Sequence, residues 1–421
     1  MRTKWRGIGQ SIFAGIAVGL GAFIVTAVYK WMAEWLTNVN EKMFAVLRMD
    51  WRFVLPAIPL FVLIAWLLSR LYCRFPDAMG GGIPNCIAEL RGVAQFDAAK
   101  ALLGTFFLSL STFLLGVPLG TEGSCVLLGA ALGKWGSQIK GMDEKRLVVA
   151  GACAGFCVAT GSPFAAVLFA FEEFSNRPSR DMLIMAATAV LTACGAARLL
   201  FPKAGLSVGL FPPVSALHIG YAQWWRVLLF AVGMGFFAWL FLKVYQQFSY
   251  FLRECEAGVP LWIKMSTVLL ATLAFGVCSH RFIAGGTSLV LSLLHAREDV
   301  KFLLALVVIR MLLSICANTV GFCGGTFVPS IAVGTTFAAV LLFVLGVPAT
   351  LDTAFLCLGI TACVAGILQM PLTAVAFTLE VLGCWHLLIP VAVTAAVSFS
   401  VAKALRAKSI NEITLSYKKK K

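Results

Sequence analysis

The sequence predicts an all-α polytopic membrane protein made of two inverted-topology repeats with broken and re-entrant helices. Three observations support this prediction: the apolar composition, an internal repeat, and glycine-rich turns that open directly into apolar runs. The 421 residues are 60% hydrophobic and only 13% charged, whereas an ordinary soluble domain is about 25% charged. A lipid bilayer explains so much apolar material, because a spanning helix takes about 20 mostly apolar residues.

Six long apolar runs are the first candidates for membrane spans. The first of them, Ile8–Val28, follows a basic start but is longer than the apolar region of a signal peptide, which has about 7–15 residues. We therefore expect it to be a retained helix. The other five are Phe53–Leu68, Ala101–Leu115, Leu183–Leu200, Val227–Leu242 and Leu304–Leu313. Later segments are shorter or are interrupted by glycine and proline, which predicts broken helices.

The charge distribution indicates how the chain is oriented. Its formal net charge is +15, from 34 basic and 19 acidic residues, and many basic residues lie in residues 1–6 and in Lys418–Lys421. Cytoplasmic segments of membrane proteins carry an excess of lysine and arginine, so we expect both termini in the cytoplasm. Nucleic-acid binding would need an exposed basic face on a soluble domain, and the sequence has none.

The cysteines and histidines give no sign of a cofactor or an enzyme. The 13 cysteines lie scattered in apolar segments without a CxxC motif, so we interpret them as small core residues and expect no metal site. The four histidines form no HExxH motif, and residues 129–134 are one residue short of a phosphate-binding loop. We therefore expect neither an enzyme nor a bound cofactor.

The chain also contains an internal repeat. Residues 120–129 recur as 325–334, with Gly-Thr at the start and glycine at the end of both segments. Pro163–Glu172 recurs as Pro371–Glu380 with five of ten positions identical, and Gly80–Gly82 has a partner in Gly285–Thr287. Such halves often have opposite orientations and bind substrate between them. We expect a first repeat at 8–205, a linker at 206–221, a second repeat at 222–405 and a basic cytoplasmic segment at 406–421.

The glycine-rich turns predict an anion site. A helix that begins inside the membrane leaves its first N–H groups free and presents the positive end of its dipole. Such an end holds an anion without a basic side chain, whose full charge would bind chloride too tightly to release it. Glycine is also common in membrane helices simply because it permits close packing. Three motifs ordered by one repeat favour the anion-site interpretation.

Two glutamates are candidates for a specialised role. Glu122 lies inside a glycine-rich turn within an apolar region, where an ionisable residue is a functional hypothesis by default. At a helix start its carboxylate would occupy the anion site and leave it when protonated. Glu172 and Glu173 end the apolar run after Pro163. Glu172 has the repeat partner Glu380 and belongs to the scaffold, whereas Glu173 has no acidic repeat partner and is the better functional candidate.

These motifs resemble those of the CLC family of chloride channels and chloride/proton antiporters, over nearly the whole chain. The family's GSGIP, GxEGP and GxFxP loops correspond to residues 80–84, 120–124 and 325–329, which read GGGIP, GTEGS and GTFVP. The resemblance implies a prokaryotic-type homodimer without cytoplasmic regulatory domains, with one pore per subunit, in a cell inner membrane. It further implies that chloride or a similar small inorganic anion is exchanged for protons across the lipid bilayer.

A passive, uncoupled or loosely coupled anion channel on the same fold is the alternative. The resemblance makes Glu122 the external gating glutamate and Glu173 the internal proton-transfer glutamate. Because a proton path through apolar surroundings needs titratable groups, this pair favours the antiporter. The preferred anion, whether chloride, fluoride or nitrate, and the coupling ratio both stay open.

The resemblance also implies which residues bind the anion. The amides of Thr326 and Phe327 match central ligands, and those of Gly80 and Gly81 lie at the inner site. The remaining candidates come from the same loops and from the C-terminal segment: Gly120, Thr121, Gly123, Val328 and Asn411.

Three residues depart from the family pattern. Gly81 replaces a serine whose hydroxyl binds the central anion, and Ser124 replaces the proline that closes the second motif. The family's C-terminal tyrosine aligns without gaps with Asn411, although Tyr417 is a second candidate. The first and third changes remove two side-chain donors, so we expect the anion to rest mainly on backbone amides.

Overall fold

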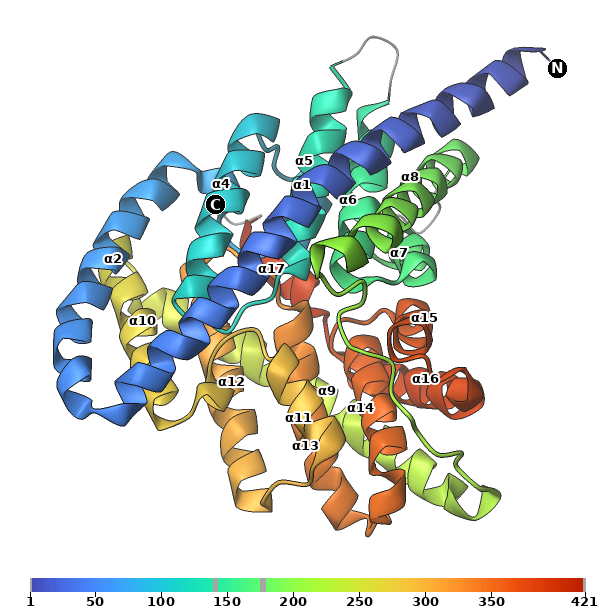
Figure 1. Cartoon of the computed structure of the whole chain (residues 1–421). Helices are drawn as coiled ribbons and strands as arrows, with labels where there is room; N and C mark the ends of the chain where they lie inside the picture. The colour runs from blue at the N-terminus through green and yellow to red at the C-terminus, as the bar shows by residue number, and fades with distance from the viewer. Residues whose placement is uncertain (1, 139–142, 175–178, 419–421) are drawn as a thin grey trace.

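The computed structural model describes residues 2–138, 143–174 and 179–418, and every regular element in these ranges is helical (Figure 1). Nine of the helices in the described ranges are long and apolar enough to cross a membrane. The predicted all-α membrane fold is thereby confirmed. The basic ends that we assigned to the cytoplasm include Met1 and residues 419–421, which lie outside the described residues.

The helices of the first half differ widely in length. A short 3₁₀ segment, Pro202–Ala204, closes this half. A π-helical turn, Ala170–Phe174, directly continues α7. The helices are α1 (Arg2–Met49), α2 (Val54–Arg74), α3 (Gly82–Leu90), α4 (Ala98–Leu114), α5 (Glu122–Gly136), α6 (Glu144–Thr160), α7 (Pro163–Phe169) and α8 (Arg180–Leu200).

The second half repeats this order of long and short helices. It opens with the 3₁₀ segment Tyr221–Gln223. One additional helix, α17, follows the last helix of this half, α16. The helices are α9 (Trp224–Cys255), α10 (Leu261–Cys278), α11 (Thr287–His295), α12 (Val300–Val320), α13 (Phe327–Val344), α14 (Asp352–Gly366), α15 (Pro371–Leu382), α16 (Leu388–Ala404) and α17 (Ile410–Lys418).

The first predicted span ended too early. The helix that contains Ile8–Val28 continues to Met49 and runs diagonally across the molecule (Figure 1). Lys30 does not interrupt it, because the side chain is buried and its ammonium group donates to the carbonyl oxygen of Ser207 at 2.9 Å. Lys30 is thus accommodated by a partner from a distant part of the chain, which sequence spacing does not reveal.

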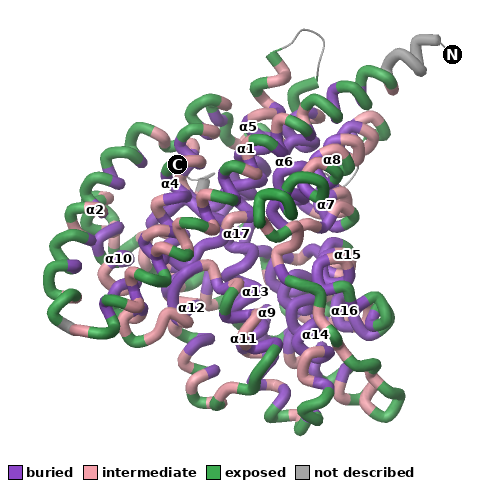
Figure 2. Tube along the Cα trace, viewed as in Figure 1, coloured by how far each residue is buried: buried purple, intermediate pink, exposed green. Residues whose placement is uncertain are grey.

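The molecule is apolar both inside and on much of its outside. Buried residues concentrate around α5, α6, α13 and α14, whereas α2 is exposed along much of its length (Figure 2). The exposed side chains of α2 are nevertheless large and apolar, among them Leu55, Ile58, Leu63 and Trp66. An apolar helix surface of this kind is stable against lipid and not against water.

Contacts between the halves follow the internal repeat. Helix α2 packs against α10, α7 against α15 and α5 against α13, so repeat-related helices meet in pairs. Within each half, α5, α6 and α8 pack in the same order as α13, α14 and α16. Reciprocal contacts of this kind arise where two similar halves are related by a two-fold axis, as in inverted-repeat transporters.

Two glutamates cap the helices of the opposite half. The Glu172 carboxylate accepts hydrogen bonds from the amides of Leu372 and Thr373, at 2.9 and 2.7 Å, in the first turn of α15. The Glu380 carboxylate accepts two corresponding bonds of 3.0 Å from the first turn of α7. A carboxylate at a helix N-terminus pairs with free amides and with the helix dipole. The scaffold role inferred for Glu172 is consistent with this geometry.

A segment without helices connects the two halves. It contacts both of them, because the Leu210 amide donates to Thr160 at the end of α6 and the Val214 amide donates to Leu382 at the end of α15, each at 3.0 Å. We propose this segment as the linker, with the boundaries at 206–221 that the repeat indicates.

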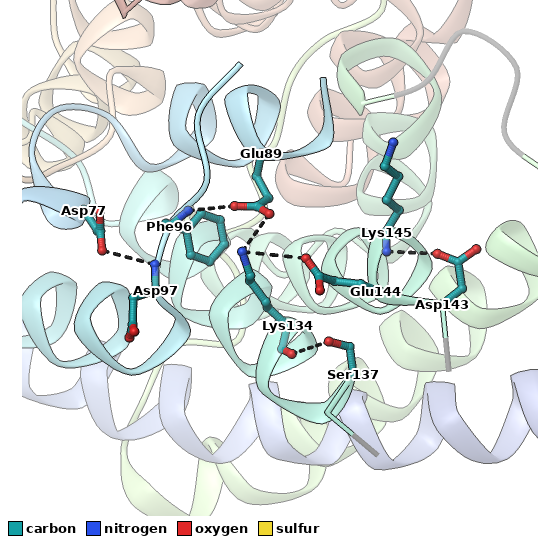
Figure 3. A network of polar contacts seen from close by, with 9 residues as sticks. All are labelled: Asp77, Glu89, Phe96, Asp97, Lys134, Ser137, Asp143, Glu144 and Lys145. Carbon is teal, nitrogen blue, oxygen red and sulfur yellow. Dashed lines mark hydrogen bonds and ion pairs between the residues drawn. The ribbon is translucent and has the colours of Figure 1, made fainter. Parts of the chain in front are cut away.

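An ion-pair network joins the far ends of α3 and α5 (Figure 3). The Lys134 ammonium group lies 2.7 Å from a Glu89 carboxylate oxygen and 3.6 Å from one of Glu144. The other Glu89 oxygen accepts the Phe96 amide at 2.8 Å. Because the opposite ends of α3 and α5 carry two of the glycine-rich motifs, this network helps to fix where those motifs lie.

We expect Lys134→Met to lower the free energy of unfolding by about 3 kcal/mol, because it leaves the buried Glu89 carboxylate without its counter-charge. Thermal unfolding of the purified protein in detergent measures the effect. Lys145→Met is the matched control, since the Lys145 side chain is exposed and only its backbone amide enters the network. Equal unfolding temperatures for both variants would show that the pair does not stabilise the fold.

Candidate functional site

The three glycine-rich loops meet at the centre of the molecule. Gly120 and Gly325 form a reciprocal pair, in which each amide donates to the other's carbonyl oxygen at 2.8 and 2.7 Å. The Gly80 amide donates to Gly321 at 3.1 Å, just before the third loop. The loops that precede α3, α5 and α13 are thereby tied together through their backbones.

The three helix starts approach one another more closely than side chains would allow. A β-carbon at Gly82 would overlap the carbonyl oxygen of Gly123. A β-carbon at Gly123 would lie 2.6 Å from the α-carbon of Gly325, closer than real contacts permit. Glycine at these positions is what lets the N-termini of α3, α5 and α13 converge.

The first amides of α5 and α13 have no partner within their own helices. In α5 the first intrahelical bond runs from the Cys125 amide to Thr121, and in α13 it runs from the Ser330 amide to Thr326. Among the described residues, neither threonine caps its helix with its hydroxyl. The amides of Gly123, Phe327 and Val328 therefore lie at uncapped helix starts, where free N–H groups and the helix dipole favour a negative charge.

Two of the predicted amide donors are already engaged. The amides of Gly80 and Gly120 donate to Gly321 and Gly325, so neither is available to an anion in this conformation. Gly80 has a φ of 80°, in the left-handed region that glycine adopts readily. We therefore propose that Gly80 and Gly120 give the loops their shape.

Glu122 is the first residue of α5 and is only 1% exposed. The Thr121 hydroxyl donates to one of its carboxylate oxygens at 2.8 Å, while the other oxygen, Oε2, has no hydrogen-bond partner among the described residues. A β-carbon at Gly120 would touch Oε2 and would lie 3.4 Å from the β-carbon of Val328. The carboxylate thus lies between the starts of α5 and α13, where an anion would also be stabilised.

Helix α11 is the fourth helix that begins at a glycine-rich loop, and its N-terminus has different neighbours from those of α3, α5 and α13. The Arg310 guanidinium is completely buried next to Gly286 and donates to the carbonyl oxygens of Arg281, Ile283 and Ala284 at 2.7–2.8 Å. Within the described part of the chain it forms no ion pair. Arg310 and Lys30 were not among the predicted residues, although a basic residue inside an apolar run is the signal that would have found both.

Glu173 lies in the π-helical turn after α7 and is in contact with Asn411 of α17. The Asn411 carboxamide Nδ2 donates to the Glu173 carboxylate at 2.9 Å, with the two residues 1% and 9% exposed, respectively. Asn411 was predicted to contact the anion, and in the structure its side chain donates to the second candidate carboxylate. Tyr417, the other candidate for this position, donates its hydroxyl to the carbonyl oxygen of Gln246 on α9.

The helix starts therefore bring free amides together with the buried carboxylate of Glu122, and Glu173 is a second buried carboxylate in a different element. This arrangement can stabilise a small anion and can bind and release protons. Among the residues that the structure describes, no group of three or more histidine, cysteine, aspartate or glutamate side chains is placed to hold a metal ion.

We expect Gly81→Ser to tighten chloride binding about tenfold, because a hydrogen bond to a charged group is worth about 1.5–3 kcal/mol. Gly81 is the N-cap residue of α3 with φ −69° and ψ 135°, a conformation that serine adopts without strain. A β-carbon there would lie 3.2 Å from Pro84 and 3.8 Å from the Gly324 carbonyl oxygen. Calorimetric titration with chloride measures the effect. Gly81→Ala adds the same carbon without the hydroxyl, and equal tightening by both variants would contradict the prediction.

A protein-family model described as "Voltage gated chloride channel" matches residues 60–403. Among curated proteins, the chain is 28% identical over 400 residues to the H(+)/Cl(-) exchange transporter ClcA of Klebsiella pneumoniae (strain 342), covering 90% of this chain and 82% of the relative. It is 26% identical over 414 residues to the ClcA transporter of Vibrio cholerae serotype O1 (strain M66-2), covering 93% of this chain and 85% of that one.

Two solved structures share the fold. A slow cyanobacterial Cl⁻/H⁺ antiporter superimposes with a TM-score of 0.85 at 21% identity and covers 98% of both chains. A CLC-type fluoride/proton antiporter superimposes with a TM-score of 0.79 at 18% identity, over 96% of this chain and 98% of the other.

Proposed function

This chain belongs to the voltage gated chloride channel family, and we propose that it exchanges chloride, or a similar small inorganic anion, for protons across a membrane. The observation that carries the proposal is the place of Glu122, a buried carboxylate with one unpartnered oxygen between two uncapped helix starts. The names of the curated relatives, which are H(+)/Cl(-) exchange transporters, point to the same activity.

In the proposed mechanism, Glu122 and the anion compete for one place. While ionised, the carboxylate takes the position where the helix starts of α5 and α13 favour negative charge. When protonated, it loses that stabilisation and swings away, and the anion binds to the amides in its place. Since each exchange of anion for carboxylate moves a proton, one side chain couples the two fluxes.

The remaining groups take the following roles in the proposal. The amides of Gly123, Thr326, Phe327 and Val328 bind the anion, with Gly81 at the inner end. The Thr121 hydroxyl holds the Glu122 carboxylate in the site, as its 2.8 Å hydrogen bond indicates. Glu173 passes protons between the interior and the inner surface of the membrane.

A loosely coupled anion channel on the same fold is the second candidate. One observation favours it: Gly81 has no side chain to donate to the anion, and the Asn411 carboxamide donates to Glu173. An anion held mainly by backbone amides leaves more easily, and an anion that leaves without a proton lowers the coupling ratio.

The chain is a multi-pass membrane protein, and we propose that it forms a homodimer in the cell inner membrane with both termini in the cytoplasm. The helices α7, α8, α15 and α16 lie together at one side of the molecule (Figure 1), and each carries exposed apolar side chains, which supports a dimer. These side chains include Phe164, Leu191, Leu372 and Ile389. Each subunit would contain its own pore, as the resemblance to the family implies.

Flux measurements on purified protein in liposomes test the proposed exchange. With an outward chloride gradient, we expect proton uptake against a pH gradient, recorded together with chloride efflux. A chloride flux without any proton movement would favour the channel, and no anion flux at all would contradict both candidates.

A further inference from the structure

The bond between Asn411 and Glu173 joins two elements that are far apart in the sequence. Asn411 is the second residue of α17, and Glu173 lies in the π-helical turn Ala170–Phe174. The start of α17 is capped independently, because the Ser409 hydroxyl accepts the Glu412 amide at 3.2 Å. The Asn411 side chain is therefore not needed to complete its own helix and is free to serve Glu173.

Glu172, the residue before Glu173, is hydrogen-bonded to the start of α15. The neighbouring Glu172 carboxylate makes two hydrogen bonds to the first turn of α15, at 2.9 and 2.7 Å. The Glu173 carboxylate instead accepts a hydrogen bond of 2.9 Å from the Asn411 carboxamide of α17. The π-helical turn thus separates two adjacent carboxylates, one fixed to the scaffold and one directed to α17.

Helix α17 in turn packs against α3, whose start forms one wall of the candidate anion site. The contact between Glu173 and Asn411 is therefore one helix away from Gly81.

The chemistry of the contact depends on the proton of Glu173. An ionised carboxylate only accepts hydrogen bonds, so the NH₂ group of Asn411 must face it, as observed. A protonated carboxyl group can also donate, and its hydroxyl group bonds to Asn411 only if the carboxamide rotates so that its carbonyl oxygen faces Glu173. Burial is the largest influence on Glu173 and disfavours the ionised form, against the Asn411 bond, which favours it. Among the charged groups nearby, Arg91 after α3 favours the ionised form, while Glu412 of α17 and the adjacent Glu172 disfavour it.

We propose that Asn411 is a positioning residue for the inner proton step, and that its carboxamide stabilises ionised Glu173 and reverses its hydrogen bond when Glu173 takes up a proton. This inference rests on the proposed exchange of anions for protons. It replaces the earlier assignment of Asn411 to the anion itself, and it gives the Asn411 carboxamide two orientations that depend on the protonation of Glu173.

Asn411→Leu tests the proposal, because leucine has a similar size and no hydrogen-bonding group. A hydrogen bond to a charged group is worth about one to two pH units of the protonation equilibrium. We expect the pH at which proton flux is half-maximal to move upward by that amount in liposomes, with chloride flux retained. Asn411→Asp should move it at least as far, since two adjacent carboxylates resist joint ionisation. Asn411→Gln keeps the carboxamide and should remain closer to the wild type.

Thr414→Val is the matched control for damage to α17, because the buried Thr414 hydroxyl donates to the carbonyl oxygen of Ile410 in its own helix. It should leave the pH midpoint of proton flux unchanged. If Asn411→Leu and Thr414→Val both follow the wild-type pH profile, Asn411 does not tune Glu173 and the proposal is wrong.

Infrared titration separates this inference from the proposed function. The band of the protonated carboxyl group, assigned by its loss in Glu173→Gln, reports the protonation of Glu173 in purified protein whether or not protons are transported. An upward shift of its midpoint in Asn411→Leu supports the bond even if the wild type moves no protons. An unshifted midpoint overturns the inference even if transport is coupled.

Discussion

Glu122→Gln is expected to conduct anions without moving protons. Glutamine has nearly the size of the protonated glutamate and no charge, so it cannot compete with the anion for the helix starts of α5 and α13 or carry a proton. In the wild type, anion flux should rise as pH falls, because protonation removes the carboxylate from the anion site. In the variant this dependence should disappear. Chloride efflux and external pH, recorded together from liposomes, measure both effects.

The matched control for this variant is Glu172→Gln. Glu172 is a partly buried glutamate that caps α15, and glutamine can still accept a hydrogen bond there through its side-chain oxygen. We expect it to retain proton coupling. If Glu122→Gln still drove protons uphill with an anion gradient, the competition between carboxylate and anion proposed above would not be the coupling step.

Gly123→Ala is expected to lower anion flux at least about tenfold, which corresponds to about 1.4 kcal/mol. The added β-carbon would lie 2.6 Å from the α-carbon and 3.2 Å from the amide nitrogen of Gly325, so α5 and α13 must separate. Overpacking of this kind also costs about 1–3 kcal/mol of folding free energy. Liposome flux and the unfolding temperature in detergent measure the two consequences.

Gly136→Ala provides the control within the same helix. Gly136 ends α5, and a β-carbon there would meet nothing within 4 Å. Alanine is about 1 kcal/mol better than glycine in a helix, so this variant should be as stable as the wild type or more stable. Normal flux in Gly123→Ala would show that the helix starts need not lie as close together as the structure has them.

Part of the site was readable from the sequence because its signals are local. Glu122 is conspicuous as a carboxylate in an apolar run, and the glycine-rich loops are conspicuous because they recur. The scaffold role of Glu172 was also readable, since its counterpart Glu380 occupies the equivalent place in the repeat. The repeat did not indicate which groups these two carboxylates bind. The structure shows that each of them caps a helix of the opposite half.

Other parts of the site depend on contacts that no spacing encodes. Arg310 fills the helix start at Gly286 with its guanidinium, whereas the related start of α3 at Gly82 packs against the Gly123 carbonyl group. The two loops look alike in the sequence, and the difference comes from a side chain on α12. In the same way, the bond of Asn411 to Glu173 follows from the packing of α17, for which the sequence offered two candidate residues, Asn411 and Tyr417.

The sequence by itself determined the membrane class, the repeat, the family motifs and the two candidate carboxylates, because composition and recurrence are properties of the chain alone. Only the tertiary structure decided which groups are available. Backbone pairing engages the amides of Gly80 and Gly120, and α17 directs Asn411 to Glu173. A hydrogen bond needs both partners at the right distance and angle, and for residues far apart in the chain that geometry exists only after the helices have packed.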